Sequence, residues 1–447
     1  MDTSQSSKSR LSRRPLVSDK HARIIIIGGG GTMGSSTALH LARRGYTNIQ
    51  VLDVWESPSN DSAGNDINKI AGADSIGLFG GVSDEAWEAW VTDPIFRPYA
   101  HNVGKLDLTV GSNDRAAHLN KKYEKLRGLG RTDVDWMDSA DAIKRKAPHL
   151  EQADITGWQG LWCANGGWVA ARQALSAVAV ECRRLGVKCA SGESGTFRTL
   201  VLDSSGRCTG VEVADGTIWE GDLIVLAAGA WSPVLVDLEG QCESKAWIYA
   251  HIQLTPEESQ AWKGIPTMYN DLYGFFMEPQ PGTGLLKLCN EFPGYTHMAL
   301  ARPFPLQKDI RMSVPRSHTR HPTDTIPDES REDIKQLIDK CLPHLRGRPL
   351  INQGMCWCTD TEDANWLLCE HPKLPGLVLA TGDSGHTFKM LPVVGSEVAD
   401  LIEDKLSDTK RHLWRWRPGA GDPNGTGEGG PRPKDLSDVE GWRSETP

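Results

Sequence analysis

The first regular pattern in the chain is a run of four isoleucines, followed by four glycines and an amphipathic stretch. Residues 24–27 are apolar throughout, which is typical of a strand buried on both faces of a parallel sheet. Beyond the glycines, Ala38, Leu39 and Ala42 recur at helical spacing before the next glycine, and residues 48–54 predict a second strand. The pattern predicts a strand, helix, strand unit.

Apolar runs that end on glycine recur twice more. Residues 223–229 and 377–382 repeat the pattern of residues 24–28. Residues 171–186 predict an amphipathic helix, and residues 187–192 predict a strand that returns to the same sheet. We therefore expect one nucleotide-binding sheet to be assembled from separated segments of the chain.

Two long segments between these runs have a different character. Residues 84–150 look mainly helical. Residues 236–350 mix strand patterns such as "YGFFMEP" and "GLLKLCN" with a helical stretch at residues 332–342. This mixture predicts an inserted domain built on a largely antiparallel sheet.

Composition and charge exclude several classes of protein. The chain has 447 residues, enough for one large or two interleaved domains, and 49 Lys+Arg against 58 Asp+Glu give a net charge of -9, which argues against a nucleic-acid-binding surface. No apolar run approaches the roughly 20 residues that a membrane helix needs, so no membrane partner is expected. The N-terminus lacks an apolar signal core and the last residues differ from the S-K-L peroxisomal address, so we expect a cytoplasmic protein with reduced cysteines.

The glycine-rich turn carries the first candidate chemistry. Gly29, Gly31 and Gly34 form G-x-G-x-x-G directly after a predicted strand and at the opening of a predicted helix, an arrangement that suits the pyrophosphate of a dinucleotide. Asp53 follows the second strand, where a carboxylate accepts hydrogen bonds from ribose hydroxyls and disfavours NADP. FAD and NAD remain, and the further glycine-ended strands favour FAD.

The stretch "CWCTDTEDANWLLCEHP" at residues 356–372 leaves several interpretations open. Its sulfur atoms are compatible with a covalent cofactor anchor, a redox pair, a buried structural thiol or a metal site. Zinc is disfavoured because Cys356, Cys358, Cys369 and His371 form C-x-C with C-x-H, which differs from the usual zinc spacing. No metal site is predicted, and His318 and His321 are interpreted as loop or core residues.

Taken together, these segments resemble fungal fructosyl amino acid and fructosyl peptide oxidases (amadoriases), in the sarcosine-oxidase branch of the D-amino-acid-oxidase superfamily. The resemblance runs from about Arg23 to Trp442. It is carried by "GGGGTMGSSTALHLARRGY", "SAGNDINKI", "GGWVAARQAL", "AAGAWSPVLVDLEGQCESKAWIYAHIQLTPEE", "RMSVPRSHTRHPTDTIPD", "CWCTDTEDANWLLCEHP", "ATGDSGHTFKMLP" and "WRWRPG".

The resemblance implies a fold and a division of the chain. The expected fold class is α/β, with an FAD-binding Rossmann-like domain assembled from discontinuous segments and an inserted α+β substrate domain. The expected division is a disordered tail at 1–22, the FAD-binding domain at 23–83, 151–235 and 351–417, the substrate-binding domain at 84–150 and 236–350, and a C-terminal extension at 418–447.

The resemblance also implies roles for single residues. Cys356 matches the cysteine bonded to the flavin 8α-methyl carbon, and Lys287 matches the lysine above flavin N5 that serves oxygen. Glu291 matches the glutamate that receives the amino-acid part of the substrate, and Lys389 the lysine at its sugar end. Lys69 lies on the loop that faces the flavin, and we expect Lys287, Lys69 and Lys389 to be the catalytic residues.

A larger set is expected to bind the cofactor. Backbone N–H groups after residue 382 are placed to address the flavin, and His386 is expected to pack there without titrating. The predicted cofactor-binding residues are Gly29, Gly31, Thr32, Gly34, Asp53, Asn68, Lys69, Gly229, Cys356, Asp383, Gly385, His386, Thr387 and Lys389.

The expected reaction is oxidation of the C1–N bond of a fructosyl amino acid or peptide to an imine, which hydrolyses to glucosone and the free amine, with O2 reduced to H2O2. The alternatives are an oxidase of saccharopine, pipecolate or an N-methyl amine, a flavoprotein without turnover, and an NAD-dependent dehydrogenase. The loop at residues 70–81 lacks the arginine that relatives often use for the carboxylate, and Asn290 stands where an aspartate is common. Arg432 is a candidate for that carboxylate, the substrate preference stays open, and a monomer is expected.

Overall fold

Strand β1 (Ile24–Ile27), the run of four isoleucines, lies within a six-stranded sheet. The structure is a computed structural model that describes residues 14–75, 77–111, 114–419 and 431–443, apart from the side chains of Leu78, Glu291 and Phe292. The other strands of this sheet are β2 (Ile49–Leu52), β9 (Lys188–Ala190), β13 (Leu223–Leu226), β21 (Leu367–Glu370) and β22 (Leu377–Thr381). Their order is β21-β22-β13-β1-β2-β9, and every pair is parallel except β21 with β22.

The three predicted glycine-ended strands are neighbours in this sheet. In the register, Ile27 lies beside Leu226 and Leu226 beside Leu379, so β1, β13 and β22 end at one edge. Because ligands of parallel sheets bind beyond the carboxyl ends of the strands, this edge is where a nucleotide site is expected. The prediction that one sheet is assembled from separated segments is confirmed.

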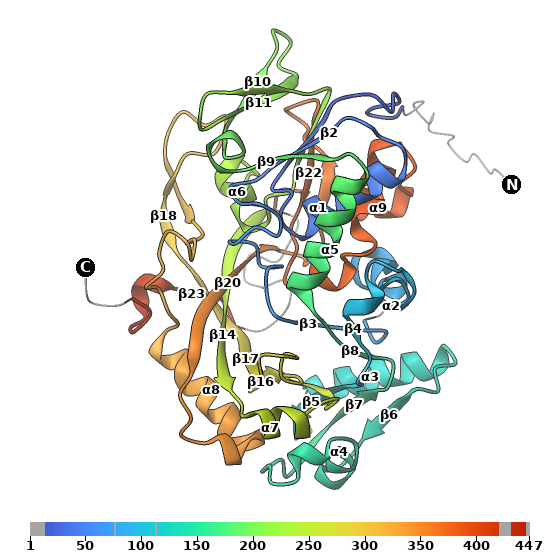
Figure 1. Ribbon diagram of the computed structural model, residues 1–447, viewed down its shortest axis with the longest axis vertical. Coiled ribbons are helices and arrows are strands. Elements are labelled where there is room, and N and C mark those ends of the chain that lie inside the picture. The colour runs from blue at the N-terminus through green and yellow to red at the C-terminus, as the bar shows by residue number, and fades with distance from the viewer. Residues whose placement is uncertain (1–13, 76, 112–113, 420–430, 444–447) are drawn as a thin grey trace, which may run out of the picture.

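Both faces of the six-stranded sheet are covered, which explains why its strands are apolar throughout. Helices α1 (Thr32–Arg43), α5 (Ala171–Arg184) and α9 (Val394–Ile402) pack beside one another on one face (Figure 1). The opposite face packs on a smaller sheet of β10 (Phe197–Leu202), β11 (Cys208–Val213) and β12 (Ile218–Glu220). Successive side chains of β1 alternate between the two cores.

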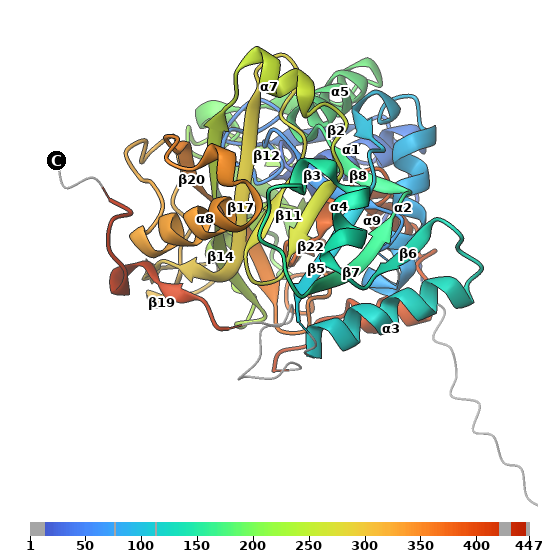
Figure 2. The same cartoon turned by 90° about the horizontal axis from the view of Figure 1, so that it is seen from below.

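A second, nine-stranded sheet fills the other side of the molecule (Figures 1 and 2). Its strands are β5 (Lys105–Val110), β6 (Val134–Met137), β7 (Trp158–Cys163), β14 (Cys242–Gln253), β15 (Thr267–Asn270), β16 (Gly274–Phe276), β17 (Leu285–Thr296), β20 (Ile351–Thr361) and β23 (Lys434–Asp435). The order is β20-β14-β17-β16-β15-β5-β7-β6, with β23 beside β17, and only β15 with β5 and β17 with β23 are parallel.

Helix α8 (Asp328–Cys341) covers the long strands of this sheet. Its buried residues Ile334, Leu337, Ile338 and Cys341 recur every three or four positions, which gives the helix one apolar face. That face packs in one core with alternate residues of β14 and β17. The intervening residues of both strands therefore point to the other side, toward the first sheet.

The remaining elements complete the two layers. The helices are α2 (Val82–Thr92), α3 (Asp114–Gly128), α4 (Ala140–Lys146), α6 (Ser232–Leu235), α7 (Pro256–Ala261) and α10 (Asp408–Leu413), and the strands are β3 (Lys69–Gly72), β4 (Ala100–His101), β8 (Gly166–Val169), β18 (Met298–Ala301) and β19 (Ile310–Ser313). In the ranges that the structure describes, no helix combines the length and apolar character needed to cross a bilayer.

The predicted fold class, a discontinuous Rossmann-like domain with a largely antiparallel second sheet, is confirmed. Residues 84–150 contain β4, β5 and β6 besides their helices, so the mainly helical interpretation of that segment was incomplete. Strands β7 and β20 pair in the nine-stranded sheet and thus cross the expected domain boundaries. The division into domains stays a prediction.

Candidate active site

The glycine turn joins β1 to α1 at the edge of the six-stranded sheet. A Cβ atom on Gly29 would lie 2.2 Å from Val51 Cγ1, and one on Gly34 would lie 2.5 Å from the Gly28 carbonyl oxygen. Both positions therefore require glycine for close packing of the turn. Helix α1 begins after Gly31 without a side-chain cap or an acidic residue in its first turn, so its N–H groups remain available to an anion.

Asp53 follows β2 beside this turn. Its Oδ2 accepts a hydrogen bond from the Gly30 N–H group at 2.9 Å, and its Oδ1 accepts one from Trp55 N–H at 3.1 Å. Burial raises the pKa of the Asp53 carboxyl, although these hydrogen bonds act in the opposite direction. The turn thus fixes the carboxylate at the cavity wall, as a ribose-binding role requires.

A cavity of about 350 Å³ lies over this edge of the sheet. We call it the cofactor cavity. It is lined by Ile27, Gly28, Gly31, Thr32, Met33, Leu52, Asp53, Val54, Ser59, Asp61, Ser62, Ala63, Gly195, Thr196, Phe197, Ala227, Ala228, Gly229, Ala230, Trp231, Leu235, Pro315, Ser317, Arg320, His321, Trp357 and Asp383. The ends of β1, β2 and β13 and the start of α1 all contribute, which is the arrangement that an extended dinucleotide needs.

A second cavity of about 310 Å³ adjoins the first. We call it the inner cavity. The two cavities share Asp61, Ser62, Ala63, Trp231 and Trp357 as lining residues. The inner cavity adds Asn60, Asn65, Asp66, Ile67, Arg172, Tyr249, His251, Arg316, His318, Met355 and Cys356. A continuous lining thus runs from the glycine turn to Cys356.

Asp66 is the centre of charge in the inner cavity. Lys69 Nζ lies 2.9 Å from Asp66 Oδ2, and Lys287 Nζ forms an ion pair with the same oxygen and lies 3.4 Å from the Asn68 carbonyl oxygen. Burial opposes ionisation of Asp66, but the two ammonium groups outweigh it and hold the pKa of the carboxyl well below its usual range. One largely buried carboxylate therefore serves the buried Lys287 and the partly buried Lys69, and the group carries a net positive charge.

Lys69 keeps its proton for the same reason. Burial lowers the pKa of its ammonium group, but the negative charge of Asp66 raises it further, so the pKa lies above its ordinary value. Lys287 is only 2% exposed. On β17 it lies between Leu286 and Leu288, which face the core, so its side chain points to the opposite side of the sheet. Its Nζ is 5.8 Å from the ring centroids of Tyr249 and Phe275.

Cys356 lies on β20 beside this charged group. Its Sγ is 3.6 Å from Lys69 Nζ and 3.9 Å from the Ala63 carbonyl oxygen, and it is only partly buried. Cys358 is buried and donates a hydrogen bond to the Lys245 carbonyl oxygen at 3.3 Å. Of the cysteines in this stretch, Cys356 is thus the one that the cavity reaches. In the part of the chain that the structure describes, no group of three or more His, Cys, Asp or Glu side chains is arranged to hold a metal ion.

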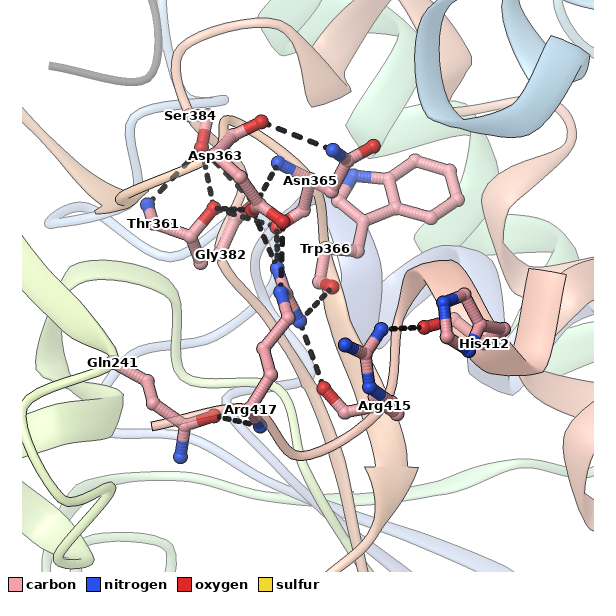
Figure 3. A network of polar contacts seen from close by, with 10 residues as sticks. All are labelled: Gln241, Thr361, Asp363, Asn365, Trp366, Gly382, Ser384, His412, Arg415 and Arg417. Atoms are coloured by element: carbon pink, nitrogen blue, oxygen red, sulfur yellow. Dashed lines mark hydrogen bonds and ion pairs between the residues drawn. The ribbon is translucent and has the colours of Figure 1, made fainter. Parts of the chain in front are cut away.

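Arg417 fixes the turn after β20 (Figure 3). Its guanidinium group donates two hydrogen bonds to the Asp363 carboxylate, at 2.9 and 2.7 Å, and others to the carbonyl oxygens of Asn365, Trp366 and Arg415. Figure 3 shows this turn next to Gly382 and Ser384, at the end of β22. The contacts join the C-terminal segment to the strand that carries Cys356.

The loop after β22 contributes Asp383 to the cofactor cavity. Burial raises the pKa of the Asp383 carboxyl to about 7, although the Thr359 N–H group donates a hydrogen bond to it at 2.6 Å. Burial, together with the charge of Lys389, lowers the pKa of His386 well below its ordinary value. A neutral His386 agrees with the prediction that it packs without titrating. Thr387 Oγ1 donates to the Asp383 carbonyl oxygen at 3.0 Å and accepts from Trp366 Nε1 at 2.7 Å.

Other predicted site residues are placed as follows. Gly229 lines the cofactor cavity with a φ of +51°, and Gly385 has a φ of +66° and packs against the Trp247 ring. The Lys389 carbonyl oxygen accepts a hydrogen bond from Trp90 Nε1 at 2.7 Å. Glu291 belongs to β17, but its side chain lies outside the described residues. Arg432 is exposed and lines neither of the two cavities.

Asn68 provides a test of whether a cofactor fits. It is 0% exposed, and neither its Oδ1 nor its Nδ2 has a hydrogen-bond partner among the described residues. Buried amides are almost always satisfied, so this side chain is built to meet a polar group that the polypeptide itself does not supply. Together with the glycine turn and the cavity lining, it shows that the residues present suit a flavin dinucleotide.

Sequence reasoning missed three residues of the inner cavity. Asp66 stands in the segment "SAGNDINKI", three residues before Lys69, but no role was predicted for it. Tyr249 and His251 alternate along β14 with core residues, so the period of two in "WIYAHIQ" was an available signal. Burial lowers the pKa of His251 to about 4, and in the register this residue lies beside Lys287.

Comparisons with known proteins agree with this geometry. The sequence profile of the family described as FAD dependent oxidoreductase matches residues 23–401. The structure of fructosyl peptide oxidase from E. terrenum is similar with a TM-score of 0.91 and 46% identity, covering 96% of this chain and 99% of that one. The structure of Amadoriase II, a deglycating fructosamine oxidase from Aspergillus fumigatus, has a TM-score of 0.84 and 34% identity, covering 96% and 98%. L-saccharopine oxidase from Schizosaccharomyces pombe is 31% identical, over 89% of this chain and 93% of its own length.

Proposed function

Because the chain belongs to the FAD-dependent oxidoreductase family, we propose that it is an oxidase of fructosyl amino acids or fructosyl peptides. The single observation that carries the chemistry is the pair of lysines, one buried and one partly buried, that shares Asp66 beside Cys356, at the end of a continuous cavity lining. The similarity to fructosyl peptide oxidase and Amadoriase II, across nearly the whole chain, supports the substrate class.

The overall reaction removes two hydrogens from the fructosyl amine, one from C1 and one from the nitrogen, which leaves a C1–N double bond. Water then hydrolyses the imine to glucosone and the free amino acid or peptide, and O2 takes up the two hydrogens to give H2O2. FAD, when bound, supplies the electron transfer between the amine and O2. The residues of the chain bind the substrate, exclude water and provide fixed charge.

Lys287 and Lys69 are proposed to act as that fixed charge. Both ammonium groups pair with the Asp66 carboxylate, and that carboxylate raises the pKa of Lys69, so the site presents fixed positive charge. Reduction of O2 develops negative charge, and a preorganised cation in a dry site stabilises it more strongly than water does. Lys389 and Glu291 are proposed to bind the sugar and the amino-acid part of the substrate. The other residues that the sequence predicts to bind the cofactor are proposed to contact the flavin dinucleotide.

Cys356 is proposed to hold the flavin through a thioether to its 8α-carbon. The bond replaces one S–H and one C–H bond, and the two hydrogens released are passed to O2. The sulfur supports this role because it lines the inner cavity and is partly exposed, whereas Cys358 on the same strand is buried. We also propose that the protein acts as a monomer, which light scattering in solution will test.

The decisive test combines a visible spectrum with anaerobic addition of fructosyl-valine. We expect acid-precipitated protein to keep its yellow colour in the pellet, and native protein to bleach with fructosyl-valine. Colour in the supernatant would refute the thioether alone. Bound flavin that stays oxidised with fructosyl-valine but bleaches with saccharopine would favour the second candidate, for which the 31% identity to L-saccharopine oxidase is the supporting observation.

A further inference from the structure

A loop between β19 and α8 forms one wall of both cavities. We call residues 315–321 the covering loop. Pro315, Ser317, Arg320 and His321 line the cofactor cavity, and Arg316 and His318 line the inner cavity. The loop comes from outside the six-stranded sheet, so it adds groups to the cofactor cavity that the glycine turn does not provide.

Asp61 ties the covering loop to the segment that follows β2. Ser317 Oγ donates a hydrogen bond to Asp61 Oδ1 at 2.7 Å, and Thr319 Oγ1 lies 3.2 Å from both carboxylate oxygens. Trp55 Nε1 donates to Asp61 Oδ2 at 2.7 Å. A two-fold ion pair of Arg316 with Asp324, at 2.6 and 3.1 Å, braces the loop itself. These contacts hold the loop in one orientation although it has no regular secondary structure.

Arg320 is the basic residue that this orientation brings to the cofactor cavity. Arg320 is exposed, and its backbone N–H group donates a hydrogen bond to Ser317 Oγ at 3.3 Å. In the described ranges, no ion pair joins its guanidinium group to another residue. The acids of the same lining are Asp53, Asp61 and Asp383, and no other arginine and no lysine line it. Arg320 thus places a positive charge in the lining of the cofactor cavity, where the acidic residues would repel an anion.

The same cavity contains the start of α1. Its lining residues Gly31, Thr32 and Met33 present N–H groups of an uncapped helix end without an acidic neighbour in the first turn. The diphosphate of a dinucleotide carries two negative charges, and a helix end supplies about half of one positive charge. A guanidinium group supplies a full charge and a planar pair of donors that matches phosphate oxygens.

We propose that Arg320 binds the diphosphate of the flavin dinucleotide together with the start of α1, and that Asp61 positions it by holding the covering loop. This inference rests on the proposed function, because it takes FAD as the occupant of the cofactor cavity. It assigns to Arg320 a cofactor-binding role, and to Asp61 a positioning role, that the glycine turn alone does not imply.

The test measures flavin affinity in a Cys356→Ser background, where no thioether holds the flavin. Apoprotein is prepared by dialysis at high salt, and FAD or riboflavin is titrated while flavin fluorescence is followed. Riboflavin lacks the diphosphate. Arg320→Gln is expected to raise the Kd for FAD about 10- to 100-fold, as for loss of a charge-assisted hydrogen bond, and to leave the Kd for riboflavin unchanged.

Two further variants separate charge, geometry and position. Arg320→Lys keeps the charge without the planar pair of donors, so it should recover part of the FAD affinity. Arg311→Gln removes an exposed arginine from neighbouring β19 that lines neither cavity, and it should bind FAD as the parent does. Thermal unfolding of each apoprotein shows whether the variant folds.

Each possible outcome either supports or overturns the proposed role of Arg320. An Arg320→Gln variant that binds FAD as tightly as the parent overturns the role of Arg320, and so does an equal loss of FAD and riboflavin affinity. A parent apoprotein that binds no flavin overturns the proposed function and this inference with it. Loss of FAD affinity alone, with riboflavin unaffected, supports the inference.

Discussion

At the scale of single residues, Asp66 is the group on which the charge of the site depends. Asp66→Asn would leave Lys69 and Lys287 buried without their counter-ion, and breaking a buried ion pair in this way typically costs about 3 to 5 kcal/mol. In the Cys356→Ser background, from which flavin can be removed, we expect the free energy of unfolding of the apoprotein to fall by about that amount at pH 7, measured by denaturant titration. Asp154→Asn, in an exposed ion pair with Lys340, should change little.

The pH dependence of stability provides a second test of the Asp66→Asn variant. Because the pKa of Asp66 is lower in the folded protein than in the unfolded chain, its stabilisation is fully present above about pH 4 and is lost as the pH falls further. The difference between the parent and Asp66→Asn should therefore shrink on acidification below pH 4. A difference that stays constant down to pH 2 would show that the carboxylate does not contribute through its charge.

Lys287 is predicted to act in the oxygen reaction. Lys287→Met removes the cation and keeps most of the side-chain volume, so we expect reoxidation of the reduced enzyme by O2 to slow by at least about 100-fold. Reduction by fructosyl-valine should change much less, and stopped-flow mixing with each reactant separates the two steps. Lys263→Met is an exposed control with no expected effect. Equal slowing of both steps would argue against a role specific to oxygen.

The contribution of Asp383 to folding stability is expected to depend on pH with the opposite sign. Its pKa is raised to about 7, so the folded protein prefers the protonated carboxyl, and the stabilisation is complete below about pH 4 and lost as the pH rises through 7. Asp383→Asn keeps an acceptor for the Thr359 N–H group but does not ionise. In thermal unfolding of flavin-free proteins in the Cys356→Ser background, the protein that keeps Asp383 should therefore lose stability relative to this variant between about pH 4 and pH 7. Parallel curves would contradict the raised pKa.

At the scale of elements, the turn after β20 depends on Arg417. Its side chain is nearly buried and holds one carboxylate and three carbonyl oxygens (Figure 3). Arg417→Lys keeps the charge but cannot make this set of contacts, so we expect a loss of about 3 kcal/mol in the free energy of unfolding. Arg415→Lys, at the exposed neighbouring arginine, should be nearly neutral. Denaturant unfolding of both variants checks the difference.

Some helices and strands of the fold could be predicted from the sequence, and others could not. The glycine-ended strands were predictable because a strand buried on both faces must be apolar throughout, which leaves an unbroken run. Strand β5 was missed because its Lys105 and Asp107 form buried ion pairs with Asp74 and Lys122, so polar residues stand where an apolar pattern was sought. The period of two was still present, because Leu106, Leu108 and Val110 alternate with polar residues, but the charged positions drew attention away from it.

The site was only partly predictable for a related reason. The glycine turn and Asp53 are local in sequence, so spacing alone identified them. Lys69, Lys287 and Cys356 come from three distant segments, and no local pattern relates them; the resemblance to amadoriases alone brought them together. Asp61 was missed because its place in both cavities depends on how distant segments come together, whereas the alternation along β14 was an available but unused signal for Tyr249 and His251.

At the scale of the whole molecule, the two sheets meet at the two cavities. The six-stranded sheet supplies the glycine turn, and the nine-stranded sheet supplies Cys356 and Lys287, so a flavin in the cavities contacts both. A ligand that contacts two layers stabilises the folded arrangement of both by its binding free energy. The proposed thioether would change this linkage, because a tethered flavin would remain attached when the protein unfolds.

This linkage makes a prediction about thermal stability. In Cys356→Ser, unfolding releases the flavin, so added FAD should raise the unfolding temperature by mass action, with about 2.7 kcal/mol of stabilisation at a free concentration of 100 times Kd. In the parent the flavin stays attached, and added FAD should have no effect. Cys358→Ser, at the buried cysteine two residues along the same strand, keeps the attachment and should behave as the parent does. An unfolding temperature of the parent that rises with added FAD would show that the flavin is held without a covalent bond, and would place the attachment to Cys356 in error while leaving the dinucleotide site intact.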